Sequence, residues 1–356
     1  MGRVIMAAGA FAMGATSAVA GGLERSPQSV AILFEQGNYA EFSIGGINPD
    51  VSGTVAGGAL SSGDMTTGYG TFSFGYKHAL NDKVDLALII DQPVGVNVSY
   101  PISAAPYPFA GSTADVDSLA FTGLIRYKLP QNFSVLGGVR TETVDGVVGI
   151  PLFSYTMTAD GDRQWGYVLG VAWEKPEIAA RVALTYNSAM THTLSANENF
   201  SPVPTEFETE IPQSVNLEFQ TGIAKDTLLF GSVRWVEWSV FDITPPAFNS
   251  VVGGSIANID DDTVSYTLGL GRRFNETWSG AVTLGYEPST GSPTGNLGPT
   301  DGYRSIGVAA TYTRGNIKVT GGLRYVDIGD ATTRGVNGNF TGNEGIGAGL
   351  RIGYSF

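Results

Sequence analysis

Cysteine is missing from the 356-residue chain, and histidine and charged residues are scarce. The absence of cysteine excludes disulfide frameworks and thiolate metal sites. The two histidines, His78 and His192, stand without a nucleophile motif around them. The run Asp260–Asp262 lacks the spacing of a calcium loop, so a solvated acidic loop is the preferred interpretation. The sequence therefore predicts no enzyme, no catalytic residue, no metal site and no cofactor.

Basic residues are also few, with 20 Lys and Arg against 33 Asp and Glu and a net charge of −13. This balance excludes nucleic acid as a partner, because phosphate contacts need a basic surface. Charged residues of both signs make up 15 % of the chain, well below the roughly 25 % of ordinary globular domains. The chain is therefore unusual both in how little charge it carries and in the sign of that charge.

Long apolar runs are confined to the N-terminus. Arg3, an apolar run from Val4 to about Met13 and the small-residue pattern Ala18-Val19-Ala20 have the order of an export signal, so residues 1–20 are predicted to be a removed signal peptide. No later stretch is long enough for a spanning helix. A membrane location would therefore require a closed β-barrel.

In place of long apolar runs, the rest of the sequence has segments in which apolar and polar residues alternate. At the C-terminus, Leu350, Ile352, Tyr354 and Phe356 fall on one face of a strand, opposite Arg351, Gly353 and Ser355. This ending resembles the terminal strand of bacterial outer-membrane barrels, which implies recognition by the barrel-assembly machinery through Tyr354 and Phe356. An edge strand of a soluble sheet is the alternative for this segment alone.

The same unit, an alternating run of about ten residues followed by a break, recurs along the chain. The predicted strands lie at 38–47, 68–80, 83–92, 115–129, 132–143, 164–174, 177–187, 212–222, 226–241, 262–274, 276–287, 302–313, 316–328 and 344–356. Short turns alternate with long loops, among them 143–163 and 188–211. This sorting by length is typical of outer-membrane barrels, and the even number of strands fits. Aromatic residues near strand ends, including Trp165, Trp235, Trp238 and Trp278, are expected to form interfacial girdles.

Ile211–Phe241 carries a family resemblance. Its Pro-x-Ser strand, short turn and W-x-x-W-S-x-F motif (Trp235, Trp238, Ser239, Phe241) resemble the long-chain fatty acid and aromatic hydrocarbon transporters of the outer membrane. The resemblance implies an all-β, 14-stranded antiparallel transmembrane barrel over 38–356, in the outer membrane of a Gram-negative cell. It also implies a plug, but only residues 21–37 precede the first strand, so the plug would be short. Ser26-Pro27-Gln28 resembles the second half of the family's plug, with Ser in place of Asn.

Two segments predicted to be extracellular loops are unusually apolar, which is typical of a binding groove. The predicted ligand-binding residues are Val147, Val148, Ile150, Leu152, Phe153, Tyr155, Met157, Tyr100, Tyr107 and Phe109. The resemblance implies that the first contact with hydrophobic ligands lies in such loops. The alternative is that these residues pack together to cap the barrel, and both can hold.

Six arginines fall in the lumen-facing register: Arg126, Arg140, Arg181, Arg234, Arg324 and Arg351. One or two of them are candidates for holding a fatty carboxylate, and a structural ladder with acidic partners is the preferred alternative. Asp91, Pro93 and Gly95 end the third predicted strand, where proline cannot donate a ladder hydrogen bond. The resemblance implies a kink here through which ligand leaves sideways, and a plain strand end is the alternative.

The function predicted from these observations is passive uptake of hydrophobic small molecules, with long-chain fatty acids as the expected ligands. The alternative is a general diffusion porin with an open polar lumen. The other expected partners are the lipid and lipopolysaccharide around a monomeric barrel.

Overall fold

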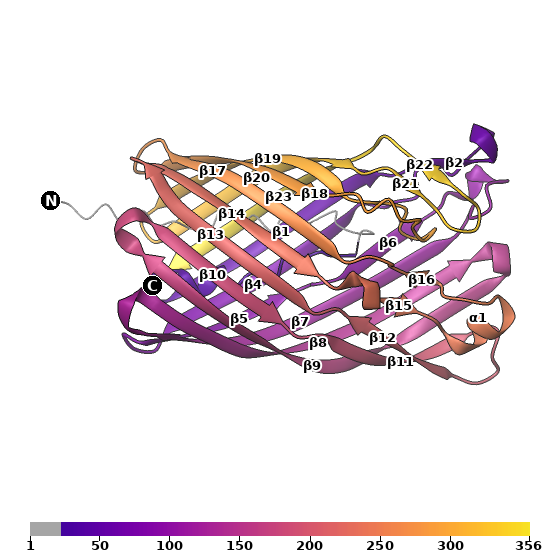
Figure 1. Ribbon diagram of the computed structural model, residues 1–356, viewed down its shortest axis with the longest axis horizontal. Helices are drawn as coiled ribbons and strands as arrows, with labels where there is room; N and C mark the ends of the chain where they lie inside the picture. The colour runs from indigo at the N-terminus through magenta and orange to yellow at the C-terminus, as the bar shows by residue number, and fades with distance from the viewer. Residues whose placement is uncertain (1–22) are drawn as a thin grey trace.

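The computed structural model describes residues 23–356, so the predicted signal peptide (1–20) lies outside the described residues. The wall of the molecule is a closed antiparallel barrel of fourteen strands, three of them interrupted (Figure 1). The wall strands are β1 (Tyr39–Asp50), β4 (Tyr69–Ala79), β5 (Val84–Asp91) with β6 (Gly95–Ser99), β7 (Thr113–Lys128), β8 (Phe133–Ile150), β9 (Tyr155–Lys175), β10 (Ala180–Asn187) with β11 (Met190–Glu198), β12 (Thr205–Ile211) with β13 (Ser214–Ala224), β14 (Thr227–Val236), β17 (Thr263–Arg273), β18 (Trp278–Glu287), β19 (Tyr303–Arg314), β20 (Ile317–Ile328) and β23 (Asn343–Ser355). The predicted fold is confirmed.

The first and last strands close the barrel. β1 pairs with β23 from Tyr39↔Ser355 to Asp50↔Glu344, and with β4 on its other side. Closure leaves no free sheet edge, which is the condition for a sheet that spans lipid. The start of β1 and the C-terminus consequently lie at the same end of the barrel (Figure 1).

Alternation along the strands sorts side chains between lipid and lumen. On β23, Leu350, Ile352 and Tyr354 are 40–47 % exposed on the outer face, whereas Arg351 turns its side chain inward. Large apolar side chains can remain this exposed without cost only when the surrounding medium is apolar. Trp165 and Trp278 lie on this outer face, as expected for a girdle. Trp238 was wrongly predicted to do so, since it is 2 % exposed and packs edge-on against Phe241.

The minor elements lie mostly in the connections. They are the strands β2 (Gly53–Val55), β3 (Leu60–Ser61), β21 (Ala331–Thr332) and β22 (Asn339–Phe340), which form one small sheet, β15 (Asp242–Ile243) with β16 (Ala257–Asn258), the helix α1 (Pro246–Val251), and the 3₁₀ turns η2 (Ala31–Phe34), η3 (Ala56–Gly58), η4 (Ile102–Ala104), η5 (Pro130–Asn132), η6 (Pro151–Phe153), η7 (Pro176–Ile178) and η8 (Trp238–Val240). Within residues 23–356, no helix is long and apolar enough to cross a membrane.

Two predicted long loops are in fact strands. β8 and β9 continue as a hairpin over most of 143–163, with only a tight turn between Ile150 and Tyr155. β11 and β12 form a second hairpin within 188–211 and add to β9 through Ser195↔Asp160. Both hairpins extend the wall on the side of the barrel away from the C-terminus (Figure 1). The loop prediction for 143–163 was wrong because Val147 and Val148 are both apolar, although their side chains face opposite sides. Their sequence therefore lacks the alternation from which the other strands were predicted.

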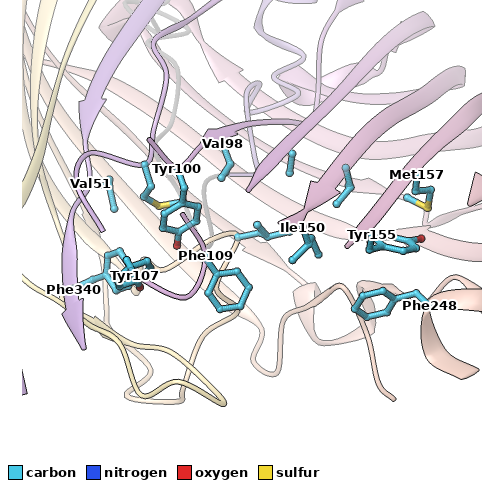
Figure 2. Packing of buried hydrophobic residues seen from close by; sticks show 14 of the residues in the cluster. Val51, Val98, Tyr100, Tyr107, Phe109, Ile150, Tyr155, Met157, Phe248 and Phe340 are labelled. Atoms are coloured by element: carbon cyan, nitrogen blue, oxygen red, sulfur yellow. The ribbon is translucent and has the colours of Figure 1, made fainter. Parts of the chain in front are cut away.

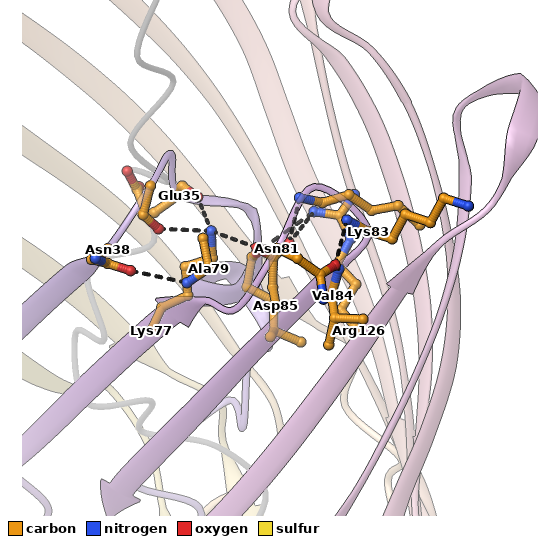
Figure 3. Close-up of polar contacts among 12 residues, drawn as sticks. Glu35, Asn38, Lys77, Ala79, Asn81, Lys83, Val84, Asp85 and Arg126 are labelled. Atoms are coloured by element: carbon orange, nitrogen blue, oxygen red, sulfur yellow. Dashed lines mark hydrogen bonds and ion pairs between the residues drawn. The ribbon is translucent and has the colours of Figure 1, made fainter.

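The N-terminal segment, defined here as Leu23–Gly37, is held to the inner wall. Lys77 donates to the backbone carbonyls of Glu35 and Gly37 at 2.8 and 2.9 Å, and Lys318 lies 3.1 Å from the Glu35 carboxylate. Figure 3 shows this region, where the buried Asp85 also forms ion pairs with Lys77 at 2.9 Å and with Arg126 at 3.8 Å. The apolar residues Val30, Ile32 and Leu33 of the segment pack on Ala87, Leu124, Leu136 and Val168 of the wall.

Candidate functional site

The apolar residues singled out in the sequence gather above the barrel in one cluster, here called the cap cluster. Seven of the ten are buried in it, at 1–7 % exposure: Tyr100, Tyr107, Phe109, Val148, Ile150, Tyr155 and Met157. Figure 2 shows Tyr155 beside Phe248 of α1 and Tyr107 beside Phe340 of β22. The Tyr100 and Tyr107 rings stack at 5.7 Å between centroids, and Tyr155 meets Phe248 edge-on at 4.7 Å. In this structure they fill the cap with one another.

The other three residues lie outside that interior. Val147 and Leu152 are 51 % and 47 % exposed, because they occupy the outward register of the hairpin and its turn. Phe153 is half-buried against Phe248, with ring centroids 5.8 Å apart. Of the seven predicted groove residues on this hairpin, Val147 and Leu152 therefore face away from the cap cluster and the other five pack in or against it.

A cavity of about 100 Å³ lies beside the cap cluster and is here called the upper pocket. Its apolar lining comes from the N-terminal segment, from β6, β7 and β8, and from the connections after β14 and β18: Leu23, Val96, Ala114, Val116, Val148, Phe241, Ile243, Ile256, Ile259 and Leu297. At the rim, Arg334 pairs with Asp260 at 3.2 Å and donates to the Asn258 side chain at 2.5 Å. An aliphatic interior with a polar rim suits a hydrophobic ligand.

A second cavity, of about 160 Å³, lies further along the same strands and is here called the lower pocket. β17 lines the upper pocket with Thr263 and the lower one with Ser265, and β18 contributes Glu287 above and Gly285 below. The lower pocket is the more polar of the two, with Glu218 among its lining residues. The two cavities therefore follow one another down the inside of the wall.

Leu23 and Glu24 of the N-terminal segment lie where the two pockets meet, and Arg25 follows them. Leu23 lines the upper pocket and Glu24 lines the lower one, where its carboxylate accepts a hydrogen bond from Arg234. Arg25 points elsewhere, towards Asn97 and Asp117. None of the three was singled out in the sequence, since their only signal was adjacency to Ser26-Pro27-Gln28.

The wall is interrupted next to these residues. β5 ends at Asp91 and β6 begins at Gly95, and the ladder between β4 and β5 stops at Phe74↔Ile90. Among residues 23–356, Tyr69–Ser73 of β4 has no ladder partner on this side, and pairing resumes only at the single bridge Thr66↔Val98. We call this interval the wall break. The structure thus shows a kink at Asp91, Pro93 and Gly95, and an exit role for it stays a prediction.

The N-terminal segment covers the wall break from within. Glu24 forms an antiparallel bridge with Val94, Arg25 N–H donates to the Pro93 carbonyl at 2.8 Å, and Gly95 N–H donates to the Leu23 carbonyl at 2.8 Å. The Ser26 hydroxyl also donates to the Asp91 carboxylate at 2.5 Å. These bonds satisfy backbone groups that a broken ladder would leave unpaired.

The six predicted lumen arginines all point inward, but with different partners. Arg126 pairs with Asp85 and Glu174, Arg234 with Glu24, and Arg351 lies 3.9 Å from Glu41. Arg140 donates to the Thr122 hydroxyl at 2.9 Å, Arg181 lies over the Phe34 ring at 4.6 Å, and Arg324 donates to Ser305 at 2.9 Å. Of the six, Arg181, Arg234 and Arg324 line the lower pocket.

A barrel whose lumen carries two successive pockets and an N-terminal segment defines a membrane channel. The family model described as "Outer membrane protein transport protein (OMPP1/FadL/TodX)" matches residues 7–292. The chain belongs to this family of outer-membrane transport proteins, and its location is the outer membrane. The family resemblance predicted from the sequence is thereby confirmed. No curated protein matches the chain in sequence.

Solved structures of low sequence identity share the fold. A Pseudomonas aeruginosa FadL homologue superposes with a TM-score of 0.76 at 16 % identity, covering 92 % of each chain. The P. putida toluene transporter TodX gives 0.65 at 12 % identity over 92 % of each chain. The Ralstonia pickettii toluene transporter TbuX gives 0.63 at 12 % identity over 90 % of each chain. At these identities the likeness is one of fold alone.

Proposed function

We propose that this protein takes up hydrophobic small molecules passively across the outer membrane, with long-chain fatty acids as its substrates. The observation that carries the proposal is the upper pocket, whose largely apolar lining includes Leu23, the residue that bonds Gly95 at the wall break. Burying each methylene of a chain contributes about 0.8 kcal/mol, so an apolar pocket can draw such ligands from water without coupled energy. The neighbours named as toluene transporters make aromatic hydrocarbons the second substrate class.

The route would begin at the cap cluster and the upper pocket. The predicted groove residues other than Val147, whose side chain faces outward, are proposed as the first contact, with Val148 shared between the cap cluster and the upper pocket. The exit would be the wall break at Asp91, Pro93 and Gly95, from which the N-terminal segment would withdraw. In this scheme residues 21–37 act as a short plug.

The lumen arginines are proposed to hold a carboxylate only where they face a cavity. Arg181, Arg234 and Arg324 meet that condition, whereas Arg126 and Arg351 lie beside acidic residues and Arg140 bonds Thr122. Barrel assembly through Tyr354 and Phe356 is also proposed, because both rings are exposed on the outer face and stack at 5.9 Å between centroids. A monomer surrounded by lipid and lipopolysaccharide completes the proposed setting.

The polar lower pocket favours the second candidate function, a diffusion porin. Uptake of a labelled long-chain fatty acid and of a small sugar, measured in cells lacking their own channels, separates the two. We expect fatty acid to enter and sugar to stay out. Entry of sugar at a comparable rate would favour the porin, and entry of neither would contradict both functions.

A matched pair of variants tests the upper pocket itself. Val148→Asp places a carboxylate in the apolar lining, and we expect it to lower fatty acid uptake about 10-fold or more, since burying an unpaired charge is costly. Val147→Asp makes the same change on the exposed outer face of the same strand and is expected to leave uptake unchanged. Equal losses in both variants would show that the hairpin matters only as structure.

A further inference from the structure

Arg25 differs from the lumen arginines in where its side chain lies. Its guanidinium is within 2.8 Å of Asp117, hydrogen-bonds Asn97, and lies over the Tyr69 ring at 4.6 Å. Tyr69 belongs to β4 and Asn97 to β6, which are the two strands that part at the wall break. The Arg25 side chain therefore bridges the two sides of the opening.

Asp117 stands on the outer face of the barrel. It shares the register of Ile125 and Tyr127, which are 49 % and 43 % exposed, whereas Leu124 and Arg126, in the opposite register, are buried. Its side chain is 56 % exposed, against 2 % for that of Arg25. A buried guanidinium thus reaches through the wall from a backbone held on the inside.

Gly95 makes room for this path. A Cβ atom on Gly95 would lie 2.0 Å from the Arg25 Cζ atom, so any side chain there would collide with the guanidinium. Gly95 pairs with Asp117 across β6 and β7, which places the vacant Cβ position on the same outer face. The Arg25 side chain can therefore pass through the wall break only because residue 95 is glycine.

The Arg25 guanidinium has a hydrogen-bond donor that no described residue uses. It carries five N–H groups, and its Nε has no hydrogen-bond partner among the described residues. Its acidic partner is 56 % exposed on the outer face, so the Asp117 carboxylate can part from the guanidinium without being left as an unpaired buried charge. By contrast, Arg234 meets Glu24 and Arg126 meets Asp85 well inside the lumen, where both acids are buried.

We propose that Arg25 recognises the carboxylate of a fatty acid as it leaves through the wall break, with the ligand carboxylate replacing Asp117 on the guanidinium. This rests on the proposed function. Arg25 would favour acids over neutral ligands of equal length. A planar fork suits a carboxylate because two parallel hydrogen bonds form at once.

The test compares a labelled long-chain fatty acid with its methyl ester in cells lacking their own channels. Arg25→Gln is expected to lower acid uptake about 10-fold while ester uptake stays at the wild-type level. Arg25→Lys, which keeps the charge without the fork, should fall between. Asp117→Asn removes the competing carboxylate and is expected to raise acid uptake about 2- to 5-fold.

The matched control is Asp327→Asn, an exposed aspartate on β20, with β23 and β1 between it and β4; it should change nothing. Equal loss of acid and ester uptake in Arg25→Gln, or no loss of either, would overturn the inference while leaving the transport function standing. If Arg25→Gln is not recovered folded, equal acid uptake in Asp117→Asn and Asp327→Asn would overturn it. Uptake of neither ligand by the wild type would overturn the proposed function and the inference together.

Discussion

At the scale of single residues, Glu198 shows how the cap is held. It is 3 % exposed, and its carboxylate accepts hydrogen bonds from the Phe248 and Ala247 N–H groups at 2.7 and 3.1 Å. Thr205 and Tyr155 donate to it at 2.5 and 2.9 Å. Burial alone would raise the pKa of Glu198, but these four donors outweigh it and lower that pKa below its ordinary value. The Glu198 carboxylate of β11 therefore links α1 to β9 and β12.

The pKa of Glu198 is lower in the folded protein than in the unfolded chain. Its contribution to the stability of the cap is therefore complete above the unfolded pKa of about 4.3, and it is lost as the pH falls through the folded pKa. The chain has no cysteine, so a spin label at Val251→Cys, which is 64 % exposed at the C-terminal end of α1, is unique. We expect its mobility to be low at neutral pH and to rise below about pH 4. In Glu198→Gln the mobility of the label at position 251 should be high at every pH. A control label at Val203→Cys should respond neither to pH nor to the Glu198→Gln substitution.

At the scale of elements, the N-terminal segment and β6 depend on each other. β6 loses β4 as a neighbour at the wall break and gains Leu23–Arg25, so the segment acts as a short added strand. An added strand of three residues has few hydrogen bonds to lose, which makes it the element of the wall best suited to detach. The sequence marked this place only through Pro93 and Gly95.

Fixing that strand tests whether it must move. Ser26 and Asp91 touch at 2.5 Å, so a Ser26→Cys/Asp91→Cys pair brings two sulfur atoms together. Oxidation to the disulfide, verified by mass spectrometry, is expected to abolish fatty acid uptake, and reduction should restore it. The two single-cysteine variants under the same treatment are the controls. Full uptake by the oxidised pair would place the exit along the lower pocket.

At the scale of the whole molecule, a fourteen-stranded wall encloses more space than its own side chains fill. The N-terminal segment and the cap cluster occupy much of it, leaving the two pockets between them. We therefore expect a small number of residues to close the barrel to free diffusion. Some of its lumen charges are neutralised in pairs, as in Lys77–Asp85 and Lys318–Glu35.

Deletion of residues 23–37 is expected to leave the barrel assembled, because its wall closes through β1 and β23 without them. The deletion should raise single-channel conductance in planar bilayers several-fold and admit a small sugar. Heat-modifiable migration on gels serves as the control for folding. A deletion variant that conducts no better than the wild type would show that the cap alone seals the pore.

The sequence by itself determined the wall. Alternation is local, since each side chain meets lipid or lumen according to its place in its own strand, and all fourteen predicted strands were found within the barrel. It determined less where a strand leaves the lipid, as in 143–157, because the outer face there is no longer obliged to be apolar. It also indicated the inward register of all six lumen arginines.

Only the tertiary structure decided the site. The upper pocket brings together Leu23, Val148 and Phe241, and the wall break brings Arg25 to Asp117, 92 positions away. No periodicity records such meetings, because they depend on where a short irregular segment lies inside a closed wall. The barrel follows from the solvent that each strand faces, whereas the site depends on which residues that closed wall brings together.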